Sequence, residues 1–224
     1  MQNRHNRIII WILAVLSPLL CAVTYPFLPE QIPVHWDVNG TVSYSGKETF
    51  LLMAALPLLL AALFIFLPKI DPRKKSYKKF GKYYDYFCMF MMAFLFIINL
   101  VIVSESFFPG RISVGIVIQM LVGVLFLFLG NMMPKFKSNF FIGFKNPWTL
   151  SNTDVWNRTH RLAGILMFLT GFVMILTCLW LPPNISFVLM LGMLLLAVLI
   201  PTVMSYLWYQ KLSADQCGNK EEDK

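Results

Sequence analysis

The sequence predicts an all-α integral membrane protein with six transmembrane helices and both termini in the cytoplasm. Three observations lead to this prediction: a high apolar content, six apolar runs of membrane-spanning length, and cations that alternate between the connections. The chain is 58% hydrophobic and only 13% charged, whereas soluble domains are about half apolar and about a quarter charged. Lipid is therefore expected to surround most of the chain.

Each apolar run has the length that a bilayer requires. About 20 helical residues cross a hydrocarbon core of about 30 Å, and a barrel would instead show short alternating segments. The first run follows Arg4 and Arg7, but it exceeds a signal-peptide core and lacks a small-residue cleavage site, so it is interpreted as a span. The six predicted spans are Ile8–Leu28, Phe50–Leu67, Tyr86–Ser104, Ile112–Gly130, Leu162–Leu181 and Ile185–Trp208.

The distribution of cations predicts the orientation. The N-terminus, the second and fourth connections and the tail carry 17 Lys and Arg, whereas the other three connections carry 2. The positive-inside rule places the cation-rich segments in the cytoplasm. The net charge of +8 follows from this asymmetry and suits the anionic headgroups of the lipid bilayer. Direct binding of nucleic acid is not expected.

The chain is expected to divide into three parts. These are an N-terminal three-span module (residues 1–104), a second three-span module (residues 105–212) and a disordered cytoplasmic tail (residues 213–224), whose polar composition is typical of disorder. The four cysteines form no C-x-x-C pair, and the three in the spans are interpreted as small buried apolar residues. They are Cys21, Cys88 and Cys178, with Cys217 in the tail.

The first connection is expected outside the cell as a short hairpin. Two prolines oppose a helix there, and Asn39-Gly40 is a strong turn signal. In an extended strand, Val34 and Trp36 point to one side and His35 to the other. The candidate outer-loop residues are Pro33, His35, Trp36 and Gly40.

The basic second connection is compatible with two structures. A short interfacial helix over residues 74–85 would place Tyr77, Phe80 and Tyr84 on one face. A solvated cationic loop that fixes the topology is the favoured interpretation, because runs of charge usually face solvent.

The fourth connection, residues 135–161, is unusually rich in aromatic residues and cations. Gly143 and Pro147 interrupt any helix in its first half. Ser151 and Asp154 match a capping box, so a helix is expected to start there and to continue into the fifth span. We expect a re-entrant or interfacial hairpin packed under the bundle.

Within that predicted helix, the side chains should separate by face. Trp156, Thr159 and Ala163 share one face, and Asn157, His160 and Arg161 lie near another. Lys145 and Arg158 are expected at the polar surface of the segment.

Catalysis and metal binding are disfavoured, so no enzyme and no cofactor are expected. Ser151, Asp154 and His160 contain the residue types of a catalytic triad, but Ser151 is used as a cap and the other two are six residues apart on different helix faces. The three histidines, His5, His35 and His160, show no metal-ligand spacing.

Ion-coupled transport is also disfavoured. Transporters usually carry ionisable residues at mid-membrane, whereas the interiors of the predicted spans contain none. The strongest polar residues there are Asn99 and Gln119, which we expect to bond to each other across the third and fourth spans.

Four motifs in and around the fourth connection resemble the signature of the SdpI immunity-protein family. They are Gly130-Asn131, Lys137-x-Asn139-x-Phe141-Ile142-Gly143, Pro147-Trp148-Thr149-Leu150-Ser151 and Val155-Trp156-x-x-Thr159-His160-Arg161. The outer Pro33-Val34-His35-Trp36 with Gly40 is similar to an N-terminal module of unknown function in the same family. One departure is Lys145, where the family more often has Arg, whose planar fork binds anions in a bidentate manner.

The resemblance implies a multi-pass immunity protein of a bacterial plasma membrane that confers resistance to a secreted antimicrobial peptide toxin. It also implies a receptor and signal transducer that holds a transcriptional repressor at the membrane. A small-molecule or lipid transporter, and a structural membrane protein without a ligand, stay open as alternatives. The candidate inner-loop residues are Lys137, Asn139, Gly143, Lys145, Pro147, Trp148, Thr149, Ser151, Trp156, Arg158, Thr159, His160 and Arg161.

Overall fold

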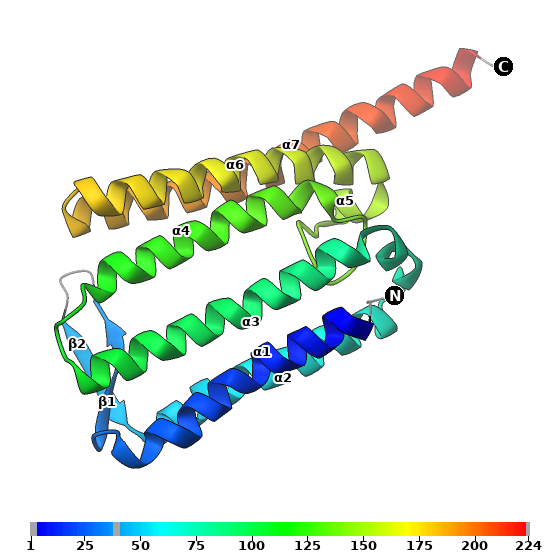
Figure 1. The fold of residues 1–224 in the computed structure, drawn as a ribbon. Helices are drawn as coiled ribbons and strands as arrows, with labels where there is room; N and C mark the ends of the chain where they lie inside the picture. The colour runs from blue at the N-terminus through cyan, green and yellow to red at the C-terminus, as the bar shows by residue number, and fades with distance from the viewer. Residues whose placement is uncertain (1–3, 38–40, 223–224) are drawn as a thin grey trace.

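Six long helices dominate the fold. The computed structural model describes residues 4–37 and 41–222, with side chains through residue 215. Within these residues, six helices are long and apolar enough to cross a membrane, which confirms the six predicted spans. They are α1 (Arg4–Thr24), α2 (Glu48–Ile70), α3 (Tyr77–Phe107), α4 (Val114–Met132), α6 (Thr153–Trp180) and α7 (Pro183–Glu222), as Figure 1 shows.

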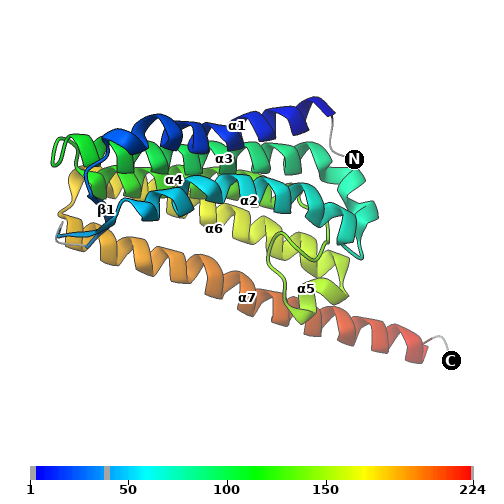
Figure 2. The ribbon, with the colours of Figure 1, turned by 90° about the horizontal axis from the view of Figure 1, so that it is seen from below.

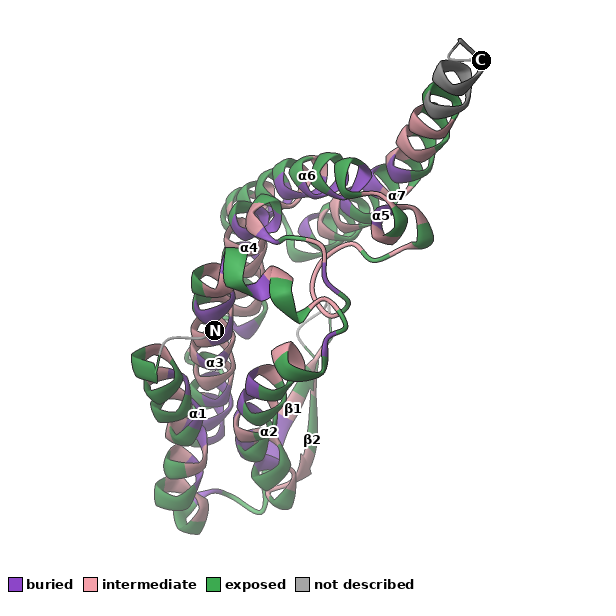
Figure 3. Cartoon of the chain, turned by 90° about the vertical axis from the view of Figure 1, so that its right-hand side faces the viewer, coloured by how far each residue is buried: buried purple, intermediate pink, exposed green. Residues whose placement is uncertain are grey.

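The helices lie side by side and define two ends of the bundle (Figure 1). At one end lie residues 71–82 and 135–161 together with the N-terminus, and we call this the basic end. At the other end lies an antiparallel hairpin of β1 (Gln31–Trp36) and β2 (Val42–Gly46), and we call this the hairpin end. Exposed residues cover the outward faces of the helices, as expected for a surface that meets lipid (Figure 3).

The hairpin prediction is confirmed. Val34 and Trp36 are partly buried against a cluster that includes Ile32 and Phe50, whereas His35 is exposed on the other side. A register shift between Pro33 and His35 marks a bulge in the pairing. The predicted Asn39-Gly40 turn, and with it the candidate residue Gly40, lies outside the described residues.

The favoured interpretation of the second connection is wrong. Instead of a solvated loop, a short 3₁₀ turn (η2, Lys74–Ser76) leads directly into α3 at Tyr77, well before the predicted start of the span. Tyr77, Phe80 and Tyr84 are buried on one face of this first part of α3. The three-to-four-residue spacing of these rings outweighs the charge of the intervening lysines, because the lysines still reach solvent on the opposite face.

The longer α3 also places an acidic residue inside a helix. Asp85 is buried, and one of its carboxylate oxygens accepts a hydrogen bond from the Asn6 amide of α1 at 2.7 Å. The apolar run gave no indication of this contact, because the run begins one residue later, at Tyr86.

The last helix continues beyond its predicted end at Trp208. The structure extends α7 to Glu222, where the sequence predicted a disordered tail from residue 213. Residues 209–217 contain neither Pro nor Gly, so nothing in them terminates a helix that is already nucleated.

The helices form two groups, which Figures 2 and 3 show from different sides. Helices α1, α2 and α3 pack on one another, and α6 packs between α4 and α7. The closest pair is α4 and α6, where Gly123 faces Gly171 and Gly130 faces Gly164. A Cβ at Gly171 would lie 2.4 Å from the Gly123 carbonyl oxygen, so the two backbones are in direct contact. The groups correspond to the two predicted three-span modules, whose boundary at residues 104 and 105 stays a prediction.

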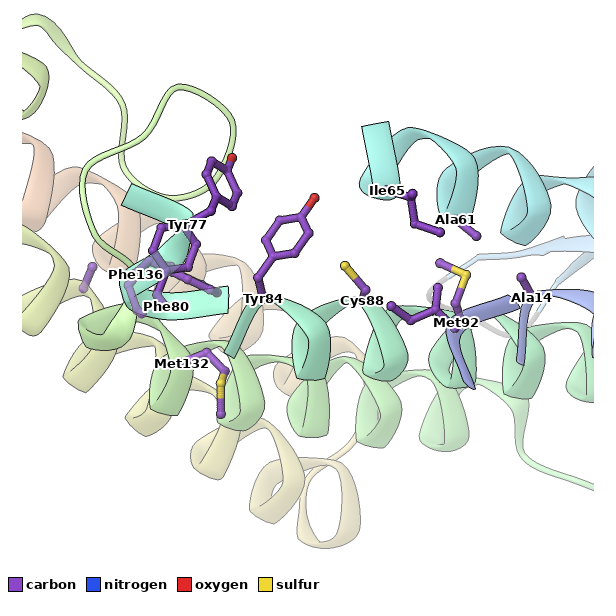
Figure 4. Close-up of a cluster of buried hydrophobic side chains, with 13 residues drawn as sticks. Ala14, Ala61, Ile65, Tyr77, Phe80, Tyr84, Cys88, Met92, Met132 and Phe136 are labelled. Carbon is purple, nitrogen blue, oxygen red and sulfur yellow. The ribbon is translucent and has the colours of Figure 1, made fainter. Parts of the chain in front are cut away.

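The two groups meet mainly through α3. The rings of Phe90 on α3 and Phe128 on α4 stack with centroids 4.0 Å apart. Nearer the basic end, Phe136 inserts against Phe80 and Phe87 in edge-to-face contacts. Figure 4 shows the resulting core, in which Tyr77, Phe80 and Phe136 gather at one end of the cluster.

The predicted bond between Asn99 and Gln119 is wrong. Asn99 donates to the Ser17 hydroxyl of α1 at 3.2 Å, inside the first group. Gln119 donates to the Met174 carbonyl of α6 at 3.2 Å and also contacts Ser186 of α7, inside the second group. The two residues lie on adjacent spans, but each faces its own three-helix group. Each residue nevertheless makes a hydrogen bond to a neighbouring helix, so the predicted structural role is confirmed although the predicted partner is wrong.

The prediction for the cysteines of the spans is confirmed. Cys21, Cys88 and Cys178 are buried free thiols.

Candidate functional site

The candidate inner loop, residues 135–161, folds back against the basic end of the bundle. It leaves α4 through a 3₁₀ turn (η3, Met133–Lys135), runs without regular structure to Asn146, and forms the short helix α5 (Pro147–Ser151) before α6 begins at Thr153. Helix α5 packs against both α6 and α7 (Figure 1). We call residues 135–161 the basic loop.

Asn139 organises the first turn of the basic loop from the inside. Its side chain is fully buried. The carboxamide oxygen accepts from the backbone N–H groups of Phe141 and Ile142 at 2.8 and 2.7 Å, and the amide donates to the carbonyls of Lys137 and Ile142. All the bonding capacity of this side chain is therefore used to hold the turn.

His160 fixes the middle of the loop to α6. Its Nδ1–H donates to the Trp156 carbonyl at 2.8 Å, and its Nε2 accepts from the Phe144 N–H at 3.1 Å. Only the neutral Nδ1–H tautomer can make both bonds. Gly143 lies beside this ring with φ +109°, and a Cβ there would lie 2.2 Å from Nε2. Glycine is therefore required for this close approach.

Trp156 continues the same buried layer. Its ring stacks on His160 with centroids 3.9 Å apart, and its Nε1–H donates to the Phe136 carbonyl at 2.9 Å. Trp156, Thr159 and Ala163 are all fully buried, as their shared helix face predicted. The expectation that His160 lies with Asn157 and Arg161 on another face is wrong, because His160 is fully buried while the other two are exposed.

Helix α5 connects the basic loop to α7. Asn146 caps α5 by accepting from the Thr149 N–H at 2.9 Å, and the Thr149 hydroxyl in turn accepts from the Asn146 N–H. The Asn146 amide donates to Ser205 of α7 at 2.8 Å, and Trp148 contacts Tyr206 with ring centroids 5.1 Å apart. This reciprocal cap was not predicted, although Asn146-Pro147 with Thr149 is its sequence signal.

The predicted cap of α6 is shifted by one residue. Asn152, not Ser151, is the N-cap, and its side chain accepts from the N–H groups of Asp154 and Val155 at 2.8 and 3.2 Å. Ser151 closes α5 instead and donates to the Trp148 carbonyl. Asn is as good a cap as Ser, and the Ser151 side chain is occupied one turn earlier. The predicted continuation of this helix into the fifth span is confirmed.

Two residues of the second connection hold the basic loop from the other module, and sequence reasoning missed both. Asp71 is 2% exposed and accepts from the Tyr77 hydroxyl at 3.1 Å and from the Phe140 N–H at 3.0 Å. Arg73 donates to the Leu150 carbonyl at 2.6 Å and to Ser138, and its guanidinium lies 5.1 Å from the Phe140 ring centroid. We call these contacts the Asp71–Arg73 joint.

The remaining candidate residues of the basic loop face outward. Lys145 and Arg158 are exposed, as predicted, and Trp148 is partly exposed beside α7. The Lys145 ammonium donates to the Phe141 carbonyl at 2.8 Å. The other exposed members of the predicted set are Lys137, Pro147, Ser151 and Arg161.

Two of the three residues considered for a catalytic triad, His160 and Ser151, bond to backbone groups instead of to each other. Both nitrogens of His160 are bonded to backbone groups, and the Ser151 hydroxyl bonds to Trp148. In residues 4–37 and 41–215, no group of three or more His, Cys, Asp or Glu side chains is arranged to hold a metal ion.

The hairpin presents a different kind of surface. Pro33 is buried and Trp36 is partly buried, so among the described candidates there only His35 points freely outward. At the base of the hairpin, the Lys47 ammonium pairs with the Glu30 carboxylate at 2.8 Å. This hydrogen bond raises the pKa of Lys47.

Comparisons with known proteins match two separate parts of the chain. Residues 135–205 match the model of the SdpI/YfhL protein family, and residues 12–61 match a domain of unknown function, DUF1648. The chain is 25% identical over 211 residues to "Immunity protein SdpI" of Bacillus subtilis (strain 168), an alignment that covers 94% of this chain and 99% of that protein. No solved structure matches the chain significantly. The resemblance of this chain to the SdpI immunity-protein family is therefore confirmed: residues 135–205 match the model of that family, and the relative aligned along most of the chain is an SdpI immunity protein.

Proposed function

We propose that this protein is an immunity protein of a bacterial plasma membrane that protects its cell against a secreted antimicrobial peptide. The observation that carries the proposal is the alignment with Immunity protein SdpI, which spans 94% of this chain and 99% of the relative. Because the alignment covers both helix groups, it includes the hairpin as well as the basic loop. The proposal therefore rests on a sequence likeness along most of the chain rather than on one motif.

In this proposal the hairpin end faces outward and the basic end faces the cytoplasm. The cation count supports this orientation, because 17 of the 19 Lys and Arg belong to the segments assigned to the basic end or the tail. The N-terminus and the basic loop lie together at that end (Figure 1). A peptide that approaches from outside would then meet the exposed His35 and the partly exposed Trp36 first.

The structure also supports a route between the two ends. Trp36 and Val34 pack on a cluster that includes Ile102 and Val103 of α3. Helix α3 begins at the opposite end beside the Asp71–Arg73 joint, which holds the basic loop. A shift of α3 on peptide binding would therefore reach the loop. A repressor held at the membrane would contact the partly exposed Trp148 and the exposed Lys145 and Arg158 of this loop. Such a relay requires two alternative packings of this joint.

The experiment that tests the proposed function is a deletion of the gene in its own host. The deletion strain, grown together with its parent, should lose viability, and a plasmid copy of the chain should restore survival. Survival of the deletion strain at the level of the parent, without the plasmid, would contradict the proposal. Transport as an alternative draws no support from Asn99 or Gln119, because both are bonded to neighbouring helices.

A further inference from the structure

A groove of about 390 Å³ lies between α4 and α6 near the basic end. Its floor is formed where Gly130 and Gly164 bring the two helix backbones into contact. A Cβ at Gly164 would lie 2.7 Å from the Gly130 carbonyl oxygen, so no side chain can fill this position. Ile165 and Phe168 form an apolar wall and are 54% and 47% exposed. The groove therefore opens toward the lipid rather than into the protein.

Cationic groups stand at the basic end of this groove. Arg161 lines the groove and lies one helical turn before Gly164 and Ile165, so it shares their face of α6. Its side chain is exposed and has neither an ion pair nor a hydrogen bond among the described residues. On the α4 side, Lys135 lies one helical turn beyond the lining residue Asn131 and outside the lining itself. Its ammonium donates to the Asn131 carboxamide oxygen at 3.3 Å and lies 5.0 Å from the centroid of the Tyr83 ring of α3.

The geometry points to a binding site for one anionic phospholipid, with an acyl chain along Ile165 and Phe168 and the phosphate between Arg161 and Lys135. A guanidinium binds a phosphate through two parallel hydrogen bonds. The Asn131 amide adds a further donor beside the Lys135 ammonium. In a bilayer, the unfilled space above the two glycines must be occupied by lipid, and an acyl chain fits its apolar lining.

Charge selects the class of lipid. The described residues place no carboxylate in an ion pair with either cation, so the site carries an uncompensated positive charge. A zwitterionic headgroup would bring its own ammonium next to two cations, whereas an anionic glycerol headgroup would not. A free phosphate ion could use the cations but would gain nothing from the apolar wall. This inference does not depend on the proposed immunity function.

The test compares lipids on the purified full-length chain. The protein is delipidated in dodecyl maltoside and titrated with phosphatidylglycerol or with phosphatidylcholine of the same acyl chains, and one-lipid complexes are counted by native mass spectrometry. We expect phosphatidylglycerol to bind at least about fivefold more tightly. We also expect Arg161→Gln and Lys135→Gln each to lower its affinity about fivefold, the ratio for one cation at an anionic headgroup.

Two control variants, Arg158→Gln and Leu176→Trp, distinguish binding at this groove from general charge attraction and from general effects of an added tryptophan. Arg158→Gln removes an exposed arginine of the same helix that does not line the groove, and it should change the affinity less than about twofold. Ile165→Trp fills the groove and should lower the affinity about tenfold, whereas Leu176→Trp, at another exposed position of α6, should not. Gel filtration and thermal unfolding identify any variant that fails to fold.

Several results would overturn the inference. Equal binding of the two lipids would indicate an ordinary lipid annulus, and an equal loss in Arg158→Gln would indicate diffuse charge attraction. An effect of Arg161→Gln without one of Ile165→Trp, together with displacement of the lipid by inorganic phosphate, would indicate a phosphate-ion site.

Discussion

The hairpin and the basic loop are both connections between spans, but they are built in opposite ways. In the basic loop, Asn139, Thr149 and His160 are fully buried, and their side chains bond to backbone groups of the same segment. In the hairpin, the outward strand positions such as His35 and Ser43 are exposed. Both connections resemble family motifs, but they differ in structure. The basic loop is packed between the two helix groups, and the hairpin presents an exposed surface to a possible partner.

This difference changes the meaning of the loop motif. Of its two tryptophans, Trp156 is buried against His160, while Trp148 stands partly exposed beside Tyr206. A substitution of Trp156 would disrupt the packing of the basic loop, so any function that depends on the folded protein would fall with it. In the proposed function, a partner of the basic loop would contact its outward-facing residues, such as Trp148, Lys145 and Arg158.

The largest expected effect breaks the internal packing of the basic loop. Trp156→Ala removes a fully buried ring and its bond to the Phe136 carbonyl, and it should cost about 4 kcal/mol of unfolding free energy. Trp180→Ala is the matched control, since that ring is 83% exposed, and it should cost less than about 0.5 kcal/mol. Reversible unfolding in mixed micelles measures both, and equal losses would show that the loop is not packed as described.

The next effect tests the connection between the modules. Asp71→Ala leaves the Tyr77 hydroxyl and the Phe140 N–H without their acceptor, and it should cost about 3 kcal/mol because both donors lose a charged partner. Asp154→Ala, at an exposed carboxylate of the same end, should stay within about 0.5 kcal/mol. Hydrogen exchange of residues 138–144 should rise in the first variant alone; unchanged exchange there would remove Asp71 from the joint.

A smaller effect is expected for alanine substitutions at two glycines, which distinguish the cost of a steric clash from the cost of backbone strain. Gly143 and Gly110 both have positive φ, at 109° and 73°, but only at Gly143 would an added Cβ meet another residue, His160. Gly110→Ala should therefore cost about 1 kcal/mol from strain alone, and Gly143→Ala about 2 kcal/mol more. The same unfolding measurement tests both variants. A similar loss of unfolding free energy in the two would mean that Gly143 is not packed closely against His160.

The variant with the smallest expected effect on stability tests the hairpin as a surface that contacts the toxin. His35→Ala changes an exposed side chain, so the unfolding free energy should change by less than about 0.5 kcal/mol. If His35 contacts the toxin, survival of cells carrying this variant should fall about tenfold, as for loss of one interface anchor. Gln31→Ala on the same strand is also exposed and should leave survival unchanged. Full protection by His35→Ala would exclude His35 from toxin binding.

The sequence predicted the spans and the hairpin because both depend on local patterns. Bilayer thickness sets the length of an apolar run, and Asn39-Gly40 between extended segments is a local turn signal. The start of α3 was missed because a hydropathy window ends at charge, whereas the burial of Tyr77, Phe80 and Tyr84 depends on which face of the helix meets Phe136.

The Asp71–Arg73 joint could not be predicted in the same way. Its partners, Phe140 and Leu150, lie 69 and 77 residues further along the chain. No spacing rule connects positions that far apart, and an Asp-Pro pair has an adequate local explanation as a turn. The predicted partners of Asn99 and Gln119 were wrong for a related reason. The polar type of a residue does not show which neighbouring helix it faces.

Cysteine labelling tests most directly whether the hairpin and the packed loop lie on opposite sides of the membrane. Ser43→Cys in the hairpin and Ser151→Cys in the basic loop each add a thiol at an exposed position, in a chain whose native Cys217 is first replaced by serine. With a membrane-impermeant maleimide, Ser43→Cys should be labelled in intact cells, and Ser151→Cys only after permeabilisation. Labelling of both variants in intact cells, or of neither, would contradict this arrangement.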